Sequence, residues 1–170
     1  VTIGIIGIGR IGTLVLRKMK SFGTLDILVN DIIPNSELDN EIKVKWGSKE
    51  KIYKEADILS LHVPLTEETA YLVNKNFIHK FEKEIYLINT SRGKCVNTKH
   101  LVSALENGRI KGACLDVLEY EKTSFEDLSK IGFTDEMQYL INSEKTILSP
   151  HIAGWTIESN VKISKILTEK

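Results

Sequence analysis

The feature that most constrains this 170-residue chain is its opening, where an apolar run leads directly into a glycine motif. Residues 1–6 are typical of a buried strand, Gly7-x-Gly9-x-x-Gly12 follows at once, and an amphipathic segment comes next. A strand, this glycine spacing and a helix together form the turn that holds a dinucleotide pyrophosphate. Gly7 permits the tight turn, Gly9 lets the backbone approach the pyrophosphate, and Gly12 lets the helix pack close to the sheet. The free N–H groups of the helix then face the phosphates.

An acidic residue follows the next strand-like segment. Residues 25–30 are apolar enough for a second buried strand, and Asp31 comes directly after it, 19 residues beyond Gly12. A carboxylate there accepts hydrogen bonds from ribose hydroxyls and repels a 2′-phosphate. No Lys or Arg occurs between Asp31 and Lys43, so the sequence predicts NAD rather than NADP. The alternative is that Asp31 only begins a turn before Pro34.

The balance of charges excludes some function classes. The chain has 23 basic and 23 acidic residues and a formal net charge of zero, so no basic excess attracts nucleic acid or an anionic membrane. The apolar runs have strand length and no signal-peptide pattern is visible, which favours a cytoplasmic protein of one domain. Because the first residue is Val1, at the first strand itself, we expect an excised or processed piece.

The cysteines and histidines do not form a metal-binding pattern. Cys95 and Cys114 match neither a Cys-x-x-Cys redox site nor a zinc ligand set, and the four histidines are scattered. We expect two reduced, partly buried thiols and no metal.

Strand-like and helix-like segments alternate along the chain. We expect further strands over 57–63, 85–89, 112–117 and 146–151, and helices over 10–22, 74–81, 98–107 and from Thr156 onward. This order predicts an α/β fold, a Rossmann-type doubly wound parallel sheet in three layers with helices on both faces. The apolar side of the first helix is expected to carry Ile11, Leu14, Val15, Met19 and Phe22. The charged stretch 43–54 is expected to be solvated surface, and 119–143 to carry helical turns at the sheet edge.

Several polar residues fall at the carboxyl ends of these strands, where open parallel sheets bind ligands. They are Asp31, His62, Thr90–Arg92, Asp116 and His151. Each alone is most simply a turn former, but together they indicate a site. Arg92 is a permanent cation suited to a carboxylate, and His151 can exchange a proton with a substrate oxygen. Hydride transfer to a carbonyl requires both.

The motifs resemble the D-isomer-specific 2-hydroxyacid dehydrogenases in order and spacing along nearly the whole chain. The matching segments are 4–12, 56–66, 88–93, 112–117 and 149–154. The resemblance implies that residues 1–155 form the dinucleotide-binding domain. Residues 156–170 would then begin a C-terminal helix that returns to a substrate domain absent from this chain.

The resemblance also implies residue roles. Arg92 would bind the substrate carboxylate and carbonyl, His151 would be the acid/base, and Glu121 would pair with His151. The family usually has proline after this Glu, where this chain has Lys122, so Glu119 is a competing carboxylate. The implied cofactor-binding residues are Gly7, Gly9, Arg10, Ile11, Gly12, Asp31, Val63, Pro64, Thr90, Ser91, Arg92, Asp116, His151, Ala153 and Gly154. Trp155, where many members have a smaller residue, is expected to pack on a neighbouring helix, with lining the site as the alternative.

The function expected from this resemblance is NAD-dependent hydride transfer between nicotinamide and a D-2-hydroxy acid or 2-oxo acid. The first substrate candidate is 3-phosphoglycerate, and a homodimer through the cofactor domain is expected. A second possibility is an NAD-sensing binding module like the corepressors that share this fold. A third is that the chain alone binds NAD but catalyses poorly, since a closing second domain normally excludes water.

Overall fold

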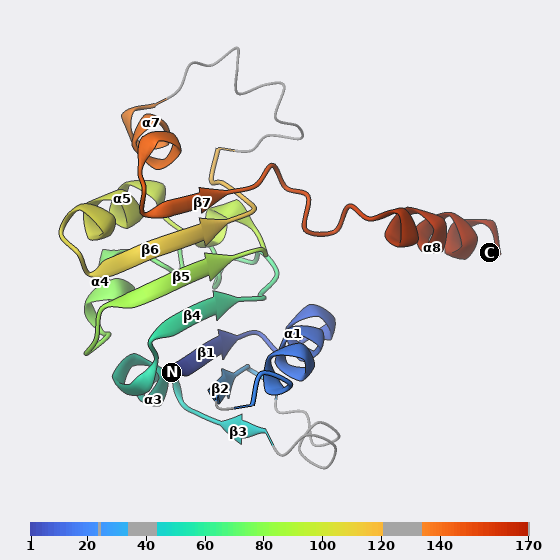
Figure 1. Ribbon diagram of the computed structural model, residues 1–170, viewed down its shortest axis with the longest axis horizontal. Helices are drawn as coiled ribbons and strands as arrows, with labels where there is room; N and C mark the ends of the chain where they lie inside the picture. The colour runs from blue at the N-terminus through green and yellow to red at the C-terminus, as the bar shows by residue number, and fades with distance from the viewer. Residues whose placement is uncertain (24, 34–43, 121–133, 170) are drawn as a thin grey trace.

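A parallel sheet forms the centre of the molecule in the computed structural model, which describes residues 1–23, 25–33, 44–120 and 134–169 (Figure 1). Within these residues the sheet has seven strands in the order β3-β2-β1-β4-β5-β6-β7. Their bounds are β1 Thr2–Ile6, β2 Asp26–Asn30, β3 Lys45–Trp46, β4 Ile58–Leu61, β5 Ile85–Asn89, β6 Ile110–Leu115 and β7 Thr146–Leu148. The order reverses direction between β1 and β4, which confirms the predicted doubly wound Rossmann-type fold.

Helices lie on both faces of the sheet, as predicted, but they cover the two faces unevenly. The helices described are α1 Arg10–Lys20, α3 Lys49–Glu55, α4 Lys75–His79, α5 Thr98–Glu106, α7 Asp135–Asn142 and α8 Ile157–Thr168, with a 3-10 turn, η1, at Gly93–Cys95. On one face α1 packs over β1 and β2. On the other, α3, α4, α5 and α7 share one large core with the strands. On the α1 face, Tyr86 of β5 and Ile147 of β7 remain 50% and 69% exposed.

The larger core is built on the face that α3, α4 and α5 cover. Leu59, Leu61 and Leu87 of the central strands are fully buried there. Tyr53 of α3 and Phe77 of α4 pack edge to face, with ring centroids 5.3 Å apart. Burial of such side chains stabilises the fold by roughly 1.5–3 kcal/mol each, so this face supplies most of the hydrophobic stabilisation.

The predicted apolar side of α1 is confirmed in part, and the prediction for the charged stretch is wrong. Val15 and Met19 pack on the smaller core beside the buried Gly12 and Leu16. Ile11, Leu14 and Phe22 are instead 60%, 49% and 72% exposed, because the helix approaches the glycine turn through Gly12. The charged stretch 43–54 is not merely solvated surface, because it contains β3 and most of α3, whose Ile52 is fully buried.

Most other expected elements are present with shorter bounds, while β5 has the predicted bounds and β6 begins and ends two residues earlier than predicted. Asn74 caps α4 and Asn97 caps α5, and Thr156 caps α8 at the predicted start of that helix. Gly108 has φ +81° directly after the end of α5, in the left-handed conformation that ends helices. The expected helical turns between 119 and 143 are confirmed by α7, while 121–133 lie outside the described residues.

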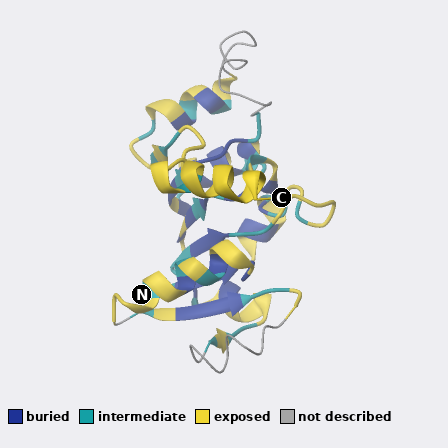
Figure 2. Cartoon of the chain, turned by 90° about the vertical axis from the view of Figure 1, so that its right-hand side faces the viewer, coloured by how far each residue is buried: buried dark blue, intermediate teal, exposed yellow. Residues whose placement is uncertain are grey.

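Helix α8 stands apart from the layers around the sheet (Figure 1), and Figure 2 shows it as exposed. None of its residues is buried, and its apolar side chains, such as Ile157 at 80% exposure, face solvent. No helix in the described part of the chain has the length and apolarity needed to span a bilayer.

Candidate cofactor and active site

In the glycine turn between β1 and α1, two of the three glycines are required by the fold and the third lies beside open space. Gly7 has φ +92°, and a Cβ there would lie 2.6 Å from the His62 carbonyl oxygen. A Cβ on Gly12 would lie 2.1 Å from the Gly7 carbonyl oxygen. Both positions therefore require glycine for the fold itself. A Cβ on Gly9 would meet no described atom within 4 Å. The space beside Gly9 is open, as the approach of a pyrophosphate requires.

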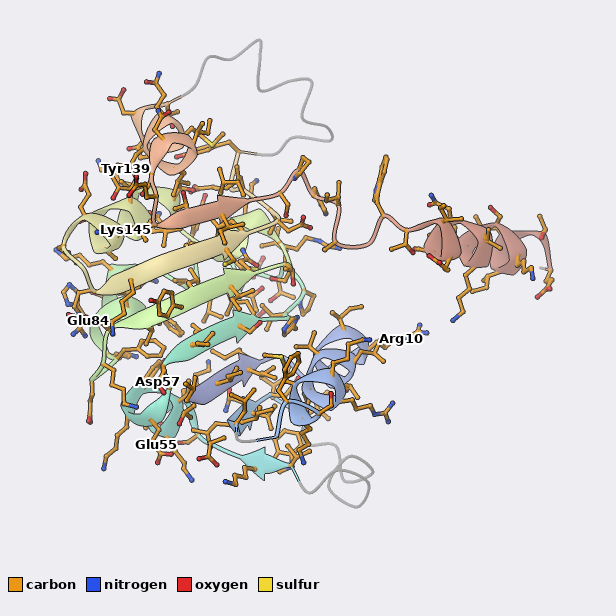
Figure 3. All side chains as sticks on the ribbon, viewed as in Figure 1. Arg10, Glu55, Asp57, Glu84, Tyr139 and Lys145 are labelled. Atoms are coloured by element: carbon orange, nitrogen blue, oxygen red, sulfur yellow. The ribbon has the colours of Figure 1, made fainter. Side chains whose placement is uncertain are left out.

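The first turn of α1 faces the same space. Gly9 caps the helix without a side-chain hydrogen bond, and no acidic residue lies in the first turn. Backbone N–H groups and the positive end of the helix dipole are thus available to an anion. Arg10 and Ile11 are both exposed in this turn, and Arg10 lies beside the carboxyl ends of the strands (Figure 3).

Asp31 is held against the glycine turn. Its Oδ2 accepts a hydrogen bond from the Ile8 amide at 2.6 Å, and its Oδ1 accepts one from the Ile33 amide at 3.2 Å. The Gly7 amide donates to the Asn30 carbonyl at 2.9 Å, which ties the end of β2 to the same turn. The carboxylate therefore stands at the position from which a ribose can be bound.

The residues that follow β4 lie next to the glycine turn at this edge of the sheet. The His62 amide donates to the Ile6 carbonyl at 2.8 Å, and His62 Nε2 lies 2.9 Å from the Ser60 hydroxyl. Burial lowers the pKa of His62. Val63 is half-buried and Pro64 is exposed directly after it, so both are accessible to a bound dinucleotide.

The turn after β5 is organised by a buried asparagine. Asn89 is fully buried; its Oδ1 accepts from the Ser91 amide at 3.1 Å and the Ser91 hydroxyl at 2.8 Å. Its Nδ2 donates to the Arg92 carbonyl at 3.1 Å. The Arg92 side chain is exposed at this edge and donates to the Ser91 carbonyl at 2.7 Å. Gly93 fixes the other end of the turn, since a Cβ there would lie 1.9 Å from the Leu118 carbonyl oxygen.

Asp116, at the end of β6, holds the turn that carries His151. The Asp116 side chain is buried, and its Oδ1 accepts from the Ser149 hydroxyl at 2.6 Å and the Ile152 amide at 2.9 Å. Its Oδ2 accepts from the Ala153 amide at 3.0 Å. Burial alone would raise the pKa of Asp116, but the hydrogen bonds from Ser149, Ala153 and Ile152 outweigh it and hold the pKa below its ordinary value.

The hydrogen bonds to Asp116 hold His151 in a left-handed backbone conformation. Its φ is +54°, which costs a non-glycine residue on the order of 1–3 kcal/mol. Its amide donates to the Asp116 carbonyl at 2.9 Å, and the Asp116 amide donates to the Asn89 carbonyl at 3.0 Å. The ends of β5, β6 and β7 are therefore linked, and the linkage brings the Arg92 turn and the His151 turn to the same edge.

The structure bears on two alternatives from the sequence, the role of Glu119 and the packing of Trp155. Glu119 Oε2 accepts from the Thr98 amide at 2.8 Å, so this carboxylate stabilises the start of α5. Glu121, the preferred partner of His151, lies outside the described residues. Trp155 is 79% exposed, so the expectation that it packs on a neighbouring helix is wrong in this chain.

The sequence predicts Asn89 only as the last residue of a strand, and a polar residue that closes an apolar run before a turn is the available signal for its role. Ser91 and Asp116, the other buried polar groups at this edge, are among the predicted site residues. Cys95 is a buried thiol and Cys114 a half-buried one, as expected. In the described ranges no cluster of three His, Cys, Asp or Glu could hold a metal ion.

These residues fit a dinucleotide. The open space at Gly9 and the start of α1, which has no side-chain cap, match the pyrophosphate. The carboxylate of Asp31 matches the adenosine ribose. The fold and this edge thus define a Rossmann-type dinucleotide-binding domain. Residues 1–153 match the family model described as "D-isomer specific 2-hydroxyacid dehydrogenase, NAD binding domain". The chain belongs to that family, and NAD is the cofactor of this domain.

Relatives and solved structures agree with this assignment. A glyoxylate reductase of Korarchaeum cryptofilum is 38% identical over 168 residues, which cover 99% of this chain and 47% of that protein. An aromatic 2-oxoacid reductase of Clostridium sporogenes is 34% identical over 160 residues, covering 93% and 48%. The structure of D-lactate dehydrogenase with NAD+ from Lactobacillus jensenii has a TM-score of 0.90 at 31% identity, covering 99% and 50%. The chain spans about half the length of the relatives it matches.

Proposed function

We propose that this domain belongs to an enzyme that interconverts a D-2-hydroxy acid and a 2-oxo acid with NAD. The observation that carries the proposal is the linkage of Asn89, Asp116 and His151. It brings an exposed arginine turn and a histidine turn to the edge that carries the glycine turn. A permanent cation and a proton-exchanging group beside a dinucleotide site are what hydride transfer to a carbonyl requires.

Each residue has a defined task in this proposal. The Arg92 guanidinium pairs with the substrate carboxylate and polarises the carbonyl oxygen. His151 gives a proton to that oxygen during reduction and takes it back during oxidation. Glu121 pairs with His151 and favours its protonated form. When bound, NAD supplies the donor or acceptor of the hydride at C2 of the substrate. The backbone of Arg10, Ile11, Thr90 and Ser91, together with Val63, Pro64, Asp116, Ala153 and Gly154, surrounds the cofactor.

The division of the chain is part of the same proposal. Residues 1–155 form the dinucleotide-binding domain, and 156–170 begin a helix that continues to a substrate domain. Two observations support this division: α8 has no buried residue, and the relatives are about twice as long. Exposed apolar side chains on a helix indicate a surface that another part of a protein covers.

The substrate is proposed only at the level of small 2-oxo acids. The names of the relatives include glyoxylate, aromatic 2-oxo acids and lactate, and 3-phosphoglycerate remains our candidate beside them. We also propose a cytoplasmic homodimer that pairs through this domain and binds neither nucleic acid nor membrane. The zero net charge supports the last two points. Light scattering during size exclusion tests the dimer.

The test is NADH oxidation by the full-length protein with glyoxylate, pyruvate, phenylpyruvate and 3-phosphohydroxypyruvate. His151→Gln should lower kcat by about 10²–10⁴-fold, the usual contribution of general acid–base catalysis. Arg92→Gln should raise KM for the 2-oxo acid and lower kcat. Lys94→Gln, an exposed lysine two residues from Arg92, is the matched control. Normal turnover in either site variant would refute the assigned roles.

Two outcomes would redirect the proposal. Tight NAD binding without turnover on any 2-oxo acid, together with an NAD-dependent change of oligomeric state, would favour the corepressor-like module. Turnover by the 170-residue chain equal to that of the full-length protein would refute the need for a second domain.

A further inference from the structure

A hollow lies between α4 and α5, away from the glycine turn. It contains about 310 Å³ of empty space, part of it open to solvent. Arg109, in its lining, directly precedes β6 at its amino end, whereas Asp116 follows β6 at its carboxyl end. The hollow therefore lies between two helices on one face of the sheet, and Arg109 places one end of it toward the edge opposite the glycine turn. Figure 3 shows that opposite edge at Glu84 and Lys145, and the cofactor edge at Arg10.

The lining is basic. Lys75 and His79 come from α4, His100 and Ser103 from α5, and Arg109 from the segment before β6. No carboxylate is among the described residues that line the hollow. Lysine and arginine are permanent cations at neutral pH, and the imidazoles add further N–H donors. Such a set in one concavity, without an acidic partner, favours an anionic ligand.

One buried atom in this lining lacks a hydrogen-bond partner. Nδ1 of His100 is inaccessible to solvent and makes no hydrogen bond in the described part of the chain. Most buried polar atoms in native proteins are paired, so an unpaired one calls for an explanation, of which a water or an ion beside it is one. Arg109 donates one guanidinium bond to the Phe81 carbonyl, which fixes the group and leaves further N–H donors.

We propose that this hollow binds a phosphate group, either inorganic phosphate or the phosphoryl group of a small metabolite. The cations and the hydroxyl of Ser103 offer donors to several oxygens at once, which suits a tetrahedral oxyanion better than a planar carboxylate. The enclosed part of the hollow is small, about 40 Å³, so it suits a group the size of a phosphate and not a dinucleotide. This site is independent of the function proposed for the opposite edge.

The test is a titration of the isotope-labelled chain with inorganic phosphate, followed through amide resonances. Ser103 and Asn107 report on the hollow, and Gly9 and Gly12 report on the glycine turn, where phosphate can also bind. We expect saturable shifts at Ser103 and Asn107. The double variant Lys75→Gln/His100→Gln should weaken them at least tenfold while leaving the shifts at Gly9 unchanged.

Lys99→Gln is the matched control, because Lys99 is an exposed lysine beside His100 that does not line the hollow. Glycerol 3-phosphate and glycerol distinguish the two sources of the group. Tighter binding of glycerol 3-phosphate than of phosphate indicates a metabolite, and equal binding indicates the free ion. Shifts confined to Gly9 and Gly12, or shifts at Ser103 that the double variant does not weaken, would overturn the proposal.

Discussion

The carboxylate of Asp116 accepts a hydrogen bond from the backbone amide of Ala153 at 3.0 Å, so β6 directly holds the turn that follows β7. The same carboxylate accepts from Ser149 and Ile152, and the Asp116 carbonyl accepts from the His151 amide. A single buried acid thus fixes the position and the left-handed backbone of His151.

Replacing Asp116 with Asn should therefore destabilise the domain. The asparagine side chain keeps one acceptor oxygen, but its NH2 group would face hydrogen-bond donors that now bind the second carboxylate oxygen. Because a buried donor then lacks an acceptor, we expect a loss of about 2–3 kcal/mol in the free energy of unfolding at pH 7. Because the folded pKa is depressed, this contribution is present above the unfolded pKa of about 3.9 and is lost as pH falls through the folded pKa. The difference in unfolding free energy between wild type and Asp116→Asn, the stability gap, should therefore disappear at pH values below the folded pKa.

Urea unfolding of wild type and Asp116→Asn at pH 7, 4 and 2.5 measures this gap. Glu144→Gln, at an exposed position, should show none at pH 7. A gap of constant size across the three pH values would show that the ionised carboxylate is not the stabilising group.

The glycine turn predicts opposite outcomes for two similar substitutions. Gly9→Ala places a methyl group in open space, so the thermal unfolding midpoint should change little while NAD affinity falls at least tenfold. Gly12→Ala forces a methyl group against the Gly7 carbonyl oxygen and should lower the midpoint markedly. Calorimetric NAD titration and thermal unfolding of both variants check this. Normal NAD affinity in Gly9→Ala would show that the pyrophosphate does not bind at this turn.

Asp31→Asn tests the choice of dinucleotide. The amide oxygen can still accept from the Ile8 amide, but the negative charge is gone. Like charges about 4 Å apart cost up to about 4 kcal/mol near a protein surface, so the ratio of NADP to NAD affinity should rise at least tenfold. Asp26→Asn is the control, since Asp26 is an exposed acid at the other end of β2. An unchanged ratio would mean that Asp31 does not face the ribose.

Asn89→Ala should loosen the arginine turn. The substitution leaves the Ser91 hydroxyl and the Ser91 amide without their buried acceptor, and the expected loss of unfolding free energy is about 2–3 kcal/mol. In the full-length protein, KM for the 2-oxo acid should rise more than kcat falls, because Arg92 loses its fixed backbone. Asn142→Ala, at an exposed position on α7, should alter neither quantity. A kcat effect alone would contradict a positioning role for Asn89.

The parts of the fold that sequence predicts best are those encoded by neighbouring residues. The strand, glycine turn and helix at the start lie within twenty residues, and Asn74, Asn97 and Thr156 each cap the helix that directly follows. The edge of the sheet that carries the site also follows from sequence, because the carboxyl ends of parallel strands meet at one edge.

Features that depend on distant contacts were missed. Ile52 and Tyr53 are buried in a helix surrounded by lysines and glutamates, so local composition hid α3. Which side of α1 is buried depends on how closely Gly12 approaches the Gly7 carbonyl oxygen. The role of Asp116 comes from donors 33 to 37 residues later in the chain, which no local pattern contains.

The exposure of Trp155 gives the protein an optical reporter of its own. Its indole is 79% exposed directly after the turn that Asp116 holds, whereas Trp46, the second of the two tryptophans, is half-buried. An indole in water fluoresces at longer wavelength than one enclosed by protein. Any ligand or polypeptide that covers this corner should therefore shift the emission to the blue, and the event can be followed without attaching a dye.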